Sequence, residues 1–486
     1  MSKNYNMSTY SFTQKDAPLF ENFLHYSRKG MAAFHTPGHR GGRGCEDLFR
    51  SLGGEFLRLD LTELKGANLD QDPDFLIKKA EELAAEAFGA KQSYFLVNGA
   101  SIGIMAALLA LKGLGKEILI ARNCHLSVIN GLILSGLKPV FISPTWVEGL
   151  PCLPSLAVVT NALKDYPDAA GVFLTNPGYH GIYGPLGEIA KLCKAKKVPL
   201  LLDEAHGGYL KYINNRIEEA STVDADLWVW GTHKMMGSLT QTGMLHLGSG
   251  FQNREKLEDA LELLSSTSPS YLLLASLDSA RRQLYLNGRA MFTRAAELSE
   301  IVRQEIINLP GLKLIENCYL PTGYGVDPTK IILSLAPVGW SGIKVEEILR
   351  QKYLIQPEYA DRDYVYIFVS YAQERKEVCS LIQALTNLAT TAGPDCDRGR
   401  IHPPPWNRQP LQLSPSEAVN KPVTYLNLQE VTGKIAAGWV AAYPPGIPLW
   451  VPGEQISSAM VEWLISFQRQ GGYIRGLKKN QVKVIQ

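Results

Sequence analysis

Short apolar runs alternate with longer amphipathic stretches through the middle of the chain. Apolar residues spaced three and four apart predict a helix over residues 74–88, which ends at Gly89. Residues 198–202 form an uncharged apolar run, which is typical of a strand buried on both faces of a sheet. Further strands are expected at residues 94–97, 118–120, 139–142, 171–175, 227–230 and 244–247. Further helices are expected at residues 102–112, 125–135, 155–165 and 187–196, and residues 255–308 are expected to be largely helical.

This alternation predicts an α/β fold in which a mostly parallel sheet is covered by helices on both faces. The sheet and its helices would occupy residues 70–300, after an N-terminal segment of residues 1–69. Residues 301–393 contain two more expected strands around a helix at 344–352, which predicts a smaller α+β domain. Residues 394–486 begin with a proline-rich linker and continue as a C-terminal domain.

The composition is that of an ordinary globular protein, and it argues against nucleic acid and membranes as partners. Of 486 residues, 45% are hydrophobic and 20% are charged. A net charge of +2 gives no electrostatic footprint for nucleic acid or for an anionic membrane. The N-terminus lacks the apolar core of a signal peptide, and no uncharged apolar stretch reaches the ~18 residues of a membrane span. The 7 cysteines include no Cys-x-x-Cys pair, which favours a reducing compartment, so we expect the cytoplasm.

Polar side chains follow several of the expected strands, at the edge where open parallel sheets bind their ligands. The turn Asn98-Gly99-Ala100-Ser101 joins a strand to a helix, so its backbone N–H groups can hold a phosphate. A turn of this kind is usually no more than a turn. Asp203 directly follows an apolar strand, and a carboxylate there needs a partner. That partner is either structural, as in a helix cap or a salt bridge, or a cationic nitrogen of a ligand.

A lysine and a histidine complete this set of residues. Lys234 follows the apolar strand that ends at Trp230, where desolvation would lower its pKa and favour a nucleophilic amine. A single lysine after a strand is more often a surface residue. His125 offers a flat ring at another strand end, although a lone loop histidine usually has a structural role. Together, a phosphate turn, a flat ring, a buried aspartate and a strand-end lysine are the parts that hold pyridoxal 5'-phosphate (PLP).

Several motifs resemble those of the ornithine/lysine/arginine decarboxylase family, whose members are fold-type I PLP enzymes with an aspartate aminotransferase-like fold. The matching segments run from residue 34 to residue 454 and so extend over nearly the whole chain. The proline-rich loop near the C-terminus separates this family from aminotransferases and cysteine desulfurases. The segments are 34–42 (FHTPGHRGG), 60–63 (DLTE), 98–101 (NGAS), 122–125 (RNCH), 175–177 (TNP), 203–207 (DEAHG), 232–234 (THK), 266–269 (STSP), 443–448 (YPPGIP) and 452–454 (PGE).

The resemblance implies a role for each matching residue. Lys234 would bind PLP covalently as a Schiff base, and Asp203 would keep the pyridine nitrogen protonated. His125 would stack on the ring, and Glu454 would grip the cationic end of the substrate. His233 and Lys234 are both candidates for the acid that protonates the substrate Cα. The phosphate would be bound by Ala100, Ser101, Thr232 and His233, and the second face of the ring would be lined by Ala205 and His206.

The implied reaction is α-decarboxylation of a basic L-amino acid. Arginine leads as the substrate, giving agmatine, ahead of lysine and ornithine, because short members of this family often make polyamine precursors. The first motif lies close to the N-terminus, so we expect the short form without the N-terminal wing domain. The family also implies a homodimer with shared active sites, in which Thr267 or Ser268 reaches the partner's phosphate. Two alternatives stay open: a PLP aminotransferase or carbon–sulfur lyase on the same fold, and a non-catalytic regulatory homologue.

A metal site is not expected from the sequence. His35 and His39 have the spacing of two ligands on a helix, but Pro37 and Gly38 lie between them and break a helix. The chain departs from the family pattern at Ala100, Leu126 and Gly178, which leaves the substrate and the efficiency open.

Overall fold

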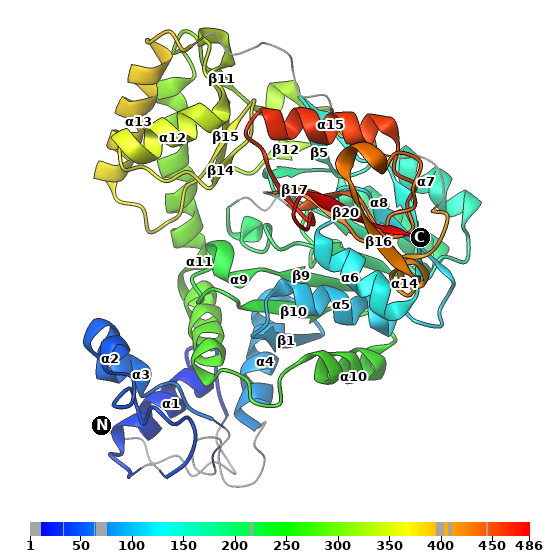
Figure 1. Ribbon diagram of the computed structural model, residues 1–486. Helices are drawn as coiled ribbons and strands as arrows, with labels where there is room; N and C mark the ends of the chain where they lie inside the picture. Colours follow the sequence, from blue (N-terminus) through cyan, green and yellow to red (C-terminus); the bar gives the residue numbers. More distant parts are fainter. Residues whose placement is uncertain are drawn as a thin grey trace.

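A seven-stranded sheet lies at the centre of the protein (Figure 1). The computed structural model describes residues 11–32, 34–62, 64, 75–213, 217–394, 403–406, 411–443 and 446–486. The strand order is β1-β10-β9-β8-β6-β2-β3, and neighbours from β9 to β3 run parallel. β10 is antiparallel to both of its neighbours, so the expected mostly parallel sheet is confirmed. The strands are β1 Gln92–Leu96, β2 Glu117–Ala121, β3 Lys138–Ile142, β6 Val172–Thr175, β8 Leu200–Asp203, β9 Leu227–Trp230 and β10 Gly243–Leu247.

Helices cover both faces of the central sheet because its strands are apolar on both sides. In β2, for example, Leu119 packs into one hydrophobic core and Ile120 into the other. The core that contains Leu119 is closed by α1 Pro18–Arg28, α4 Phe75–Phe88, α7 Leu156–Asp165, α8 Leu186–Lys196 and the part of α11 Tyr271–Ile306 that ends at Ala295. The opposite core is closed by α5 Ala100–Ala110, α6 Leu126–Ser135 and α10 Arg254–Leu264.

The helix α11 connects the central sheet to a second, smaller sheet (Figure 1). Residues of α11 up to Ala295 pack on the central sheet, and those from Leu298 to Ile306 pack on the small one. Residues 255–308 are helical as expected, except for a break between α10 and α11. The small sheet has the order β11-β13-β15-β14 and is covered by two further helices. These elements are β11 Lys313–Leu314, β13 Lys330–Ser334, α12 Gly342–Lys352, β14 Tyr359–Ala360, β15 Val365–Phe368 and α13 Arg375–Ala389.

The C-terminal elements form their own small core and pack beside α6 through α14 Pro415–Val419 (Figure 1). Two small antiparallel sheets, β16-β20 and β18-β17-β19, pack with α15 Ser458–Arg469. The sequence pattern gave no strands for this part because its apolar runs are short. The strands are β16 Val423–Asn427, β17 Val440–Tyr443, β18 Ile447–Trp450, β19 Tyr473–Arg475 and β20 Gln481–Ile485.

Short elements complete the described part of the chain. The strand β12 Gly325–Val326 pairs with β7 Ile182–Tyr183, and β4 Thr145–Val147 pairs with β5 Leu150–Cys152. No helix in the described ranges is both long and apolar enough to cross a bilayer. Glu63, Pro444 and Pro445, which belong to motifs of the sequence, lie outside the described residues. The remaining helices are α2 Glu46–Leu52, α3 Gly54–Leu57 and α9 Thr232–Met235.

Candidate active site

Asp203, His233 and Lys234, which the sequence singled out, lie at the carboxyl edge of the central sheet. Asp203 is the last residue of β8 and pairs in register with Val229 of β9. Because these strands run parallel, the turn that follows β9 begins at the same edge. That turn starts α9, which carries His233 and Lys234. Thr175 of β6 also pairs with Asp203, so the loop after β6 starts there too.

The amine of Lys234 contacts His206. The distance between Lys234 Nζ and His206 Nε2 is 2.6 Å. Burial lowers the pKa of His206 far below its usual value, and the nearby charge of Lys234 adds to this. His206 is therefore neutral at physiological pH and can accept a hydrogen bond from the amine. Residue Lys234 keeps exposed surface in the single chain, but desolvation of its amine by the surrounding protein lowers its pKa, while the charges of Asp203 and Glu358 oppose that shift.

Asp203 and His125 occupy different depths in the site. Asp203 is only 4% exposed, and its carboxylate accepts the backbone N–H of Ala205 at 3.1 Å. His125 is exposed and caps α6, where its Nδ1 accepts the backbone N–H of Ser127 at 3.2 Å. This hydrogen bond fixes the plane of the ring. A buried carboxylate thus lies beside an open, oriented aromatic face.

The turn before α5 can bind an anion through its backbone. Gly99 has a φ of +77°, a left-handed conformation that favours glycine, and it offers no side chain to cap the helix. The N–H groups of Ala100 and Ser101 begin the helix, where the dipole favours negative charge. Gly243 of β10 packs against this turn, and a Cβ on it would lie 2.9 Å from the Ala100 nitrogen. The turn therefore needs glycine on both sides.

Thr232 and His233 are held by the start of β10. His233 Nδ1 lies 2.6 Å from the carbonyl oxygen of Thr242, and the Thr232 hydroxyl donates to the Thr242 hydroxyl at 3.4 Å. Burial lowers the pKa of His233. Both residues sit beside Lys234 on α9.

These residues fit PLP by their chemistry and geometry. Gly99 leaves the N–H groups at the start of α5 uncapped, which suits a phosphate. Asp203 supplies a buried carboxylate for a pyridinium nitrogen, and Lys234 supplies an amine of lowered pKa. His206 Nδ1 is buried and has no hydrogen-bond partner among the described residues.

Glu454 lies in a different environment from the one that the sequence suggested. It is 3% exposed, and its carboxylate accepts hydrogen bonds from the Arg122 guanidinium at 3.2 Å and from the Val451 backbone at 3.1 Å. Arg122 also donates to the carbonyl oxygens of Pro448 at 2.7 Å and Leu449 at 2.9 Å. The pair fastens the C-terminal loop to the end of β2. The role of Glu454 in substrate binding stays a prediction.

Sequence reasoning assigned no role to two residues of this region, Tyr179 and Glu358. The ring of Tyr179 lies 4.7 Å from the ring of His206, edge to face. The Tyr179 hydroxyl donates to Glu358 Oε1 at 2.7 Å. Tyr179 follows the matched motif at residues 175–177, so its position carried a signal. Glu358 comes from the smaller sheet region, and no sequence motif marked its position.

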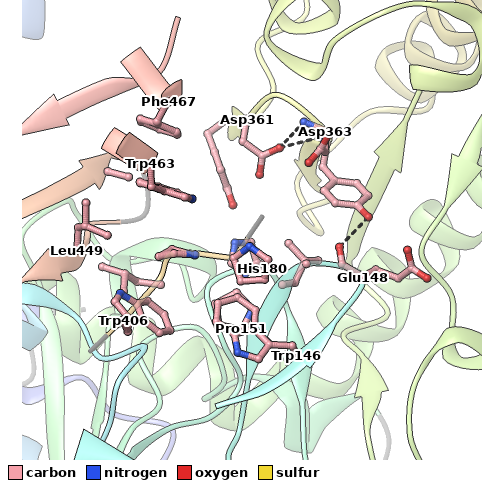
Figure 2. Close-up of a pocket in the computed structure, with 18 residues that line it drawn as sticks. Trp146, Glu148, Pro151, His180, Asp361, Asp363, Trp406, Leu449, Trp463 and Phe467 are labelled. Carbon is pink, nitrogen blue, oxygen red and sulfur yellow. Dashed lines mark hydrogen bonds between the residues drawn. The ribbon is translucent and has the colours of Figure 1, made fainter. Parts of the chain in front are cut away.

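A cavity of about 130 Å³ lies next to Tyr359, whose ring is 5.1 Å from that of Tyr179. Figure 2 shows aromatic side chains from separate segments around it, with Trp406, Trp463 and Phe467 on one side and Asp361 and Asp363 on the other. Tyr366 and two backbone N–H groups donate to the Asp361 carboxylate, so its hydrogen-bonding capacity is largely used. The cavity lies where the β4–β5 pair, the β14 end of the smaller sheet and the C-terminal elements meet.

Comparison with known proteins places the chain in a family. The model for "Orn/Lys/Arg decarboxylase, major domain" matches residues 17–377, and the model for the C-terminal domain of the same proteins matches residues 408–480. The chain belongs to the Orn/Lys/Arg decarboxylase family. The resemblance inferred from the motifs is thereby confirmed.

Family relatives of two kinds match the chain. An arginine decarboxylase of Halalkalibacterium halodurans is 34% identical over 95% of this chain and 96% of its own length. An inducible lysine decarboxylase of Escherichia coli is 22% identical over 95% of this chain and 78% of its own length. The solved structure of a Francisella novicida lysine decarboxylase superimposes with a TM-score of 0.81 at 20% identity, covering 97% of this chain and 81% of its own. The expected fold-type I architecture is confirmed.

Replacing Arg122 with methionine is expected to loosen the C-terminal loop. The change leaves the buried Glu454 carboxylate without its cationic partner, which costs about 3–5 kcal/mol for a buried pair. Hydrogen exchange of residues 448–454 should then speed up strongly. Arg350→Met is a matched control, because its ion pair with Glu346 is partly exposed and contributes below about 1 kcal/mol. Equal protection of the loop in both variants would contradict this role of Arg122.

Proposed function

We propose that this protein catalyses the PLP-dependent α-decarboxylation of a basic L-amino acid, with arginine favoured over lysine and ornithine. The observation that carries the proposal is the Lys234 amine, bound to neutral His206 at the sheet edge where Asp203 ends β8. The name of the relative at 34% identity supports arginine, and that of the relative at 22% identity supports lysine less strongly.

Each part of the cofactor has a residue that fits it. The N–H groups of Ala100 and Ser101, with Thr232 and His233, would hold the phosphate. His125 would stack on one face of the ring, with Ala205 and His206 lining the other. Asp203 would bind the pyridine nitrogen, and Lys234 would attach the cofactor. When bound, PLP supplies an electron sink for the pair left behind as the carboxylate departs.

The protein's own residues control the protons at this site. His206 orients the Lys234 amine by accepting its hydrogen bond. Because the pKa of Lys234 is lowered, its amine reaches the neutral, nucleophilic form more easily than an ordinary lysine. His233 is fixed by the Thr242 carbonyl and lies beside Lys234. Lys234 and His233 are the two candidate acids for protonation of Cα.

We extend the proposal to a cytoplasmic homodimer that makes polyamine precursors. Lys234 and His125 are both exposed in the single chain, which suits a site that a second subunit completes. Thr267 and Ser268 are exposed in the loop between α10 and α11, where they are free to reach a partner's phosphate.

Product identification tests the proposed reaction. Purified enzyme with PLP is incubated separately with L-arginine, L-lysine and L-ornithine, and amine and carbon dioxide are measured. We expect agmatine from arginine to form fastest. No amine from any of the three would refute the proposal, and a keto acid or sulfide product would favour an aminotransferase or a carbon–sulfur lyase.

Borohydride reduction tests the assignment of Lys234. Reduction should fix PLP irreversibly to the wild-type chain, and Lys234→Ala should abolish this adduct because the attaching amine is gone. Lys211→Ala is the matched control, since Lys211 is a half-buried lysine of the same sheet region that donates to the Phe88 carbonyl. Mass spectrometry of peptides locates the adduct. An adduct that persists in Lys234→Ala would show that another lysine carries PLP.

A further inference from the structure

Glu358 connects the smaller sheet region to the candidate active site. It directly precedes β14 and is exposed in the single chain. Its carboxylate accepts the hydroxyl of Tyr179 at 2.7 Å, and the Tyr179 ring packs edge to face on His206. His206 in turn binds the Lys234 amine. Two side chains therefore lead from Glu358 to the reactive lysine.

Unlike Glu454 and Asp327, Glu358 has no cationic partner among the described residues. Glu454 is paired with Arg122, and Asp327 lies 3.7 Å from the ammonium group of Lys330. In the described ranges, no lysine or arginine lies at ion-pair distance from Glu358. One hydrogen bond from a neutral hydroxyl leaves most of its acceptor capacity unused. Its negative charge is thus available to a bound cation.

The charge of Glu358 reaches the position of the reactive amine. Asp203 and then Glu358 raise the pKa of Lys234, opposing the effect of burial. A carboxylate that stabilises a cation at Lys234 also stabilises a cationic group of a molecule bound beside that lysine. In the proposed holoenzyme, Asp203 is engaged by the pyridine nitrogen. Of the two carboxylates that raise the pKa of Lys234, Glu358 is then the one left for the substrate.

We propose that Glu358 is a specificity-determining residue that binds the guanidinium or ammonium group at the far end of the substrate, and that Tyr179 holds its carboxylate in place. The inference rests on the proposed decarboxylase function and names how that site selects basic amino acids. An amino acid of the same shape without this charge gains nothing from Glu358.

This assignment differs from the one that the family resemblance implies for Glu454. To reach a substrate, Glu454 would have to leave both Arg122 and the Val451 backbone. Arg122 would then stay buried without its carboxylate, and an unpaired buried charge is strongly unfavourable. Glu358 meets no such obstacle, because it is exposed and bound by one hydroxyl.

Steady-state kinetics of the holoenzyme tests the inference. The KM and kcat of wild type and Glu358→Gln are measured with the best of the three basic substrates and with L-citrulline, a neutral analogue of arginine. Loss of a charge-assisted hydrogen bond should raise the KM for the basic substrate about ten- to a hundredfold, with little change in kcat. Turnover of citrulline should stay unchanged. Calorimetric binding of the amine product should weaken by the same factor.

Matched variants separate recognition from a structural effect. Glu347→Gln removes a carboxylate from α12 in the same sheet region, where it pairs with Lys344, and should leave every constant unchanged. Glu358→Asp keeps the negative charge and should retain most of the preference for the basic substrate over citrulline. Tyr179→Phe removes the hydroxyl that holds Glu358. The KM of this variant for the basic substrate should therefore also rise, by a smaller factor than in Glu358→Gln.

The outcomes distinguish this inference from the proposed function. If wild type makes no amine from a basic amino acid, the proposed function fails and Glu358 loses its assigned role with it. If wild type is active and Glu358→Gln keeps the full preference for the charged substrate, the inference alone is overturned. Should Glu358→Gln not fold, as judged by circular dichroism, an unchanged preference in Tyr179→Phe overturns it.

Discussion

The parallel register of β6, β8 and β9 is the constraint on which the candidate site depends. Thr175, Asp203 and Val229 lie side by side across these strands, although they are far apart in the sequence. Because all three strands run the same way, the loops that follow them open at one edge. The strand β8 fixes the position of Asp203, and a turn of only a few residues after β9 fixes the position of Lys234. A sheet buried on both faces therefore sets the distance between the carboxylate and the amine more rigidly than a loop could.

The buried pair of Arg122 and Glu454 extends this arrangement to the C-terminal elements. Arg122 follows β2 at the same edge of the sheet and binds two carbonyl groups of the C-terminal loop as well as Glu454. That loop reaches the site, since a Cβ on Gly446 would lie 3.9 Å from the ring of His125. A buried pair with four directed hydrogen bonds costs desolvation but fixes one orientation. The Arg122–Glu454 pair thus adds to the packing of α14 on α6 in docking the C-terminal elements, and it holds the loop that lies beside His125.

The sequence was informative where local pattern decides the structure. Continuous apolar runs predicted the strands of the central sheet, and the positions of Asp203 and Lys234 after such runs predicted their place at its edge. The family motifs named Ala100, His125 and His206, but their roles toward PLP stay predictions. The partner of Glu454 could not be read, because a carboxylate in a loop carries no sign of which distant arginine it meets. The short strands of the C-terminal elements were missed since tertiary packing, not periodicity, fixes them.

Glu358 shows why substrate choice is hard to read from a sequence of this kind. It contacts Tyr179 because one sheet region packs on another, and no sequence motif at residue 358 predicts that contact. The continuous helix α11 packs on both sheets, so the two regions are joined by a stiff element and not by a flexible linker. In the proposed enzyme, the chemistry would come from strand ends of the central sheet, while Glu358 of the smaller region would face the part of the substrate that differs between amino acids. On this proposal, a change of substrate would require altering Glu358 and its support from Tyr179, and would leave Asp203, Lys234 and the strands that place them unchanged.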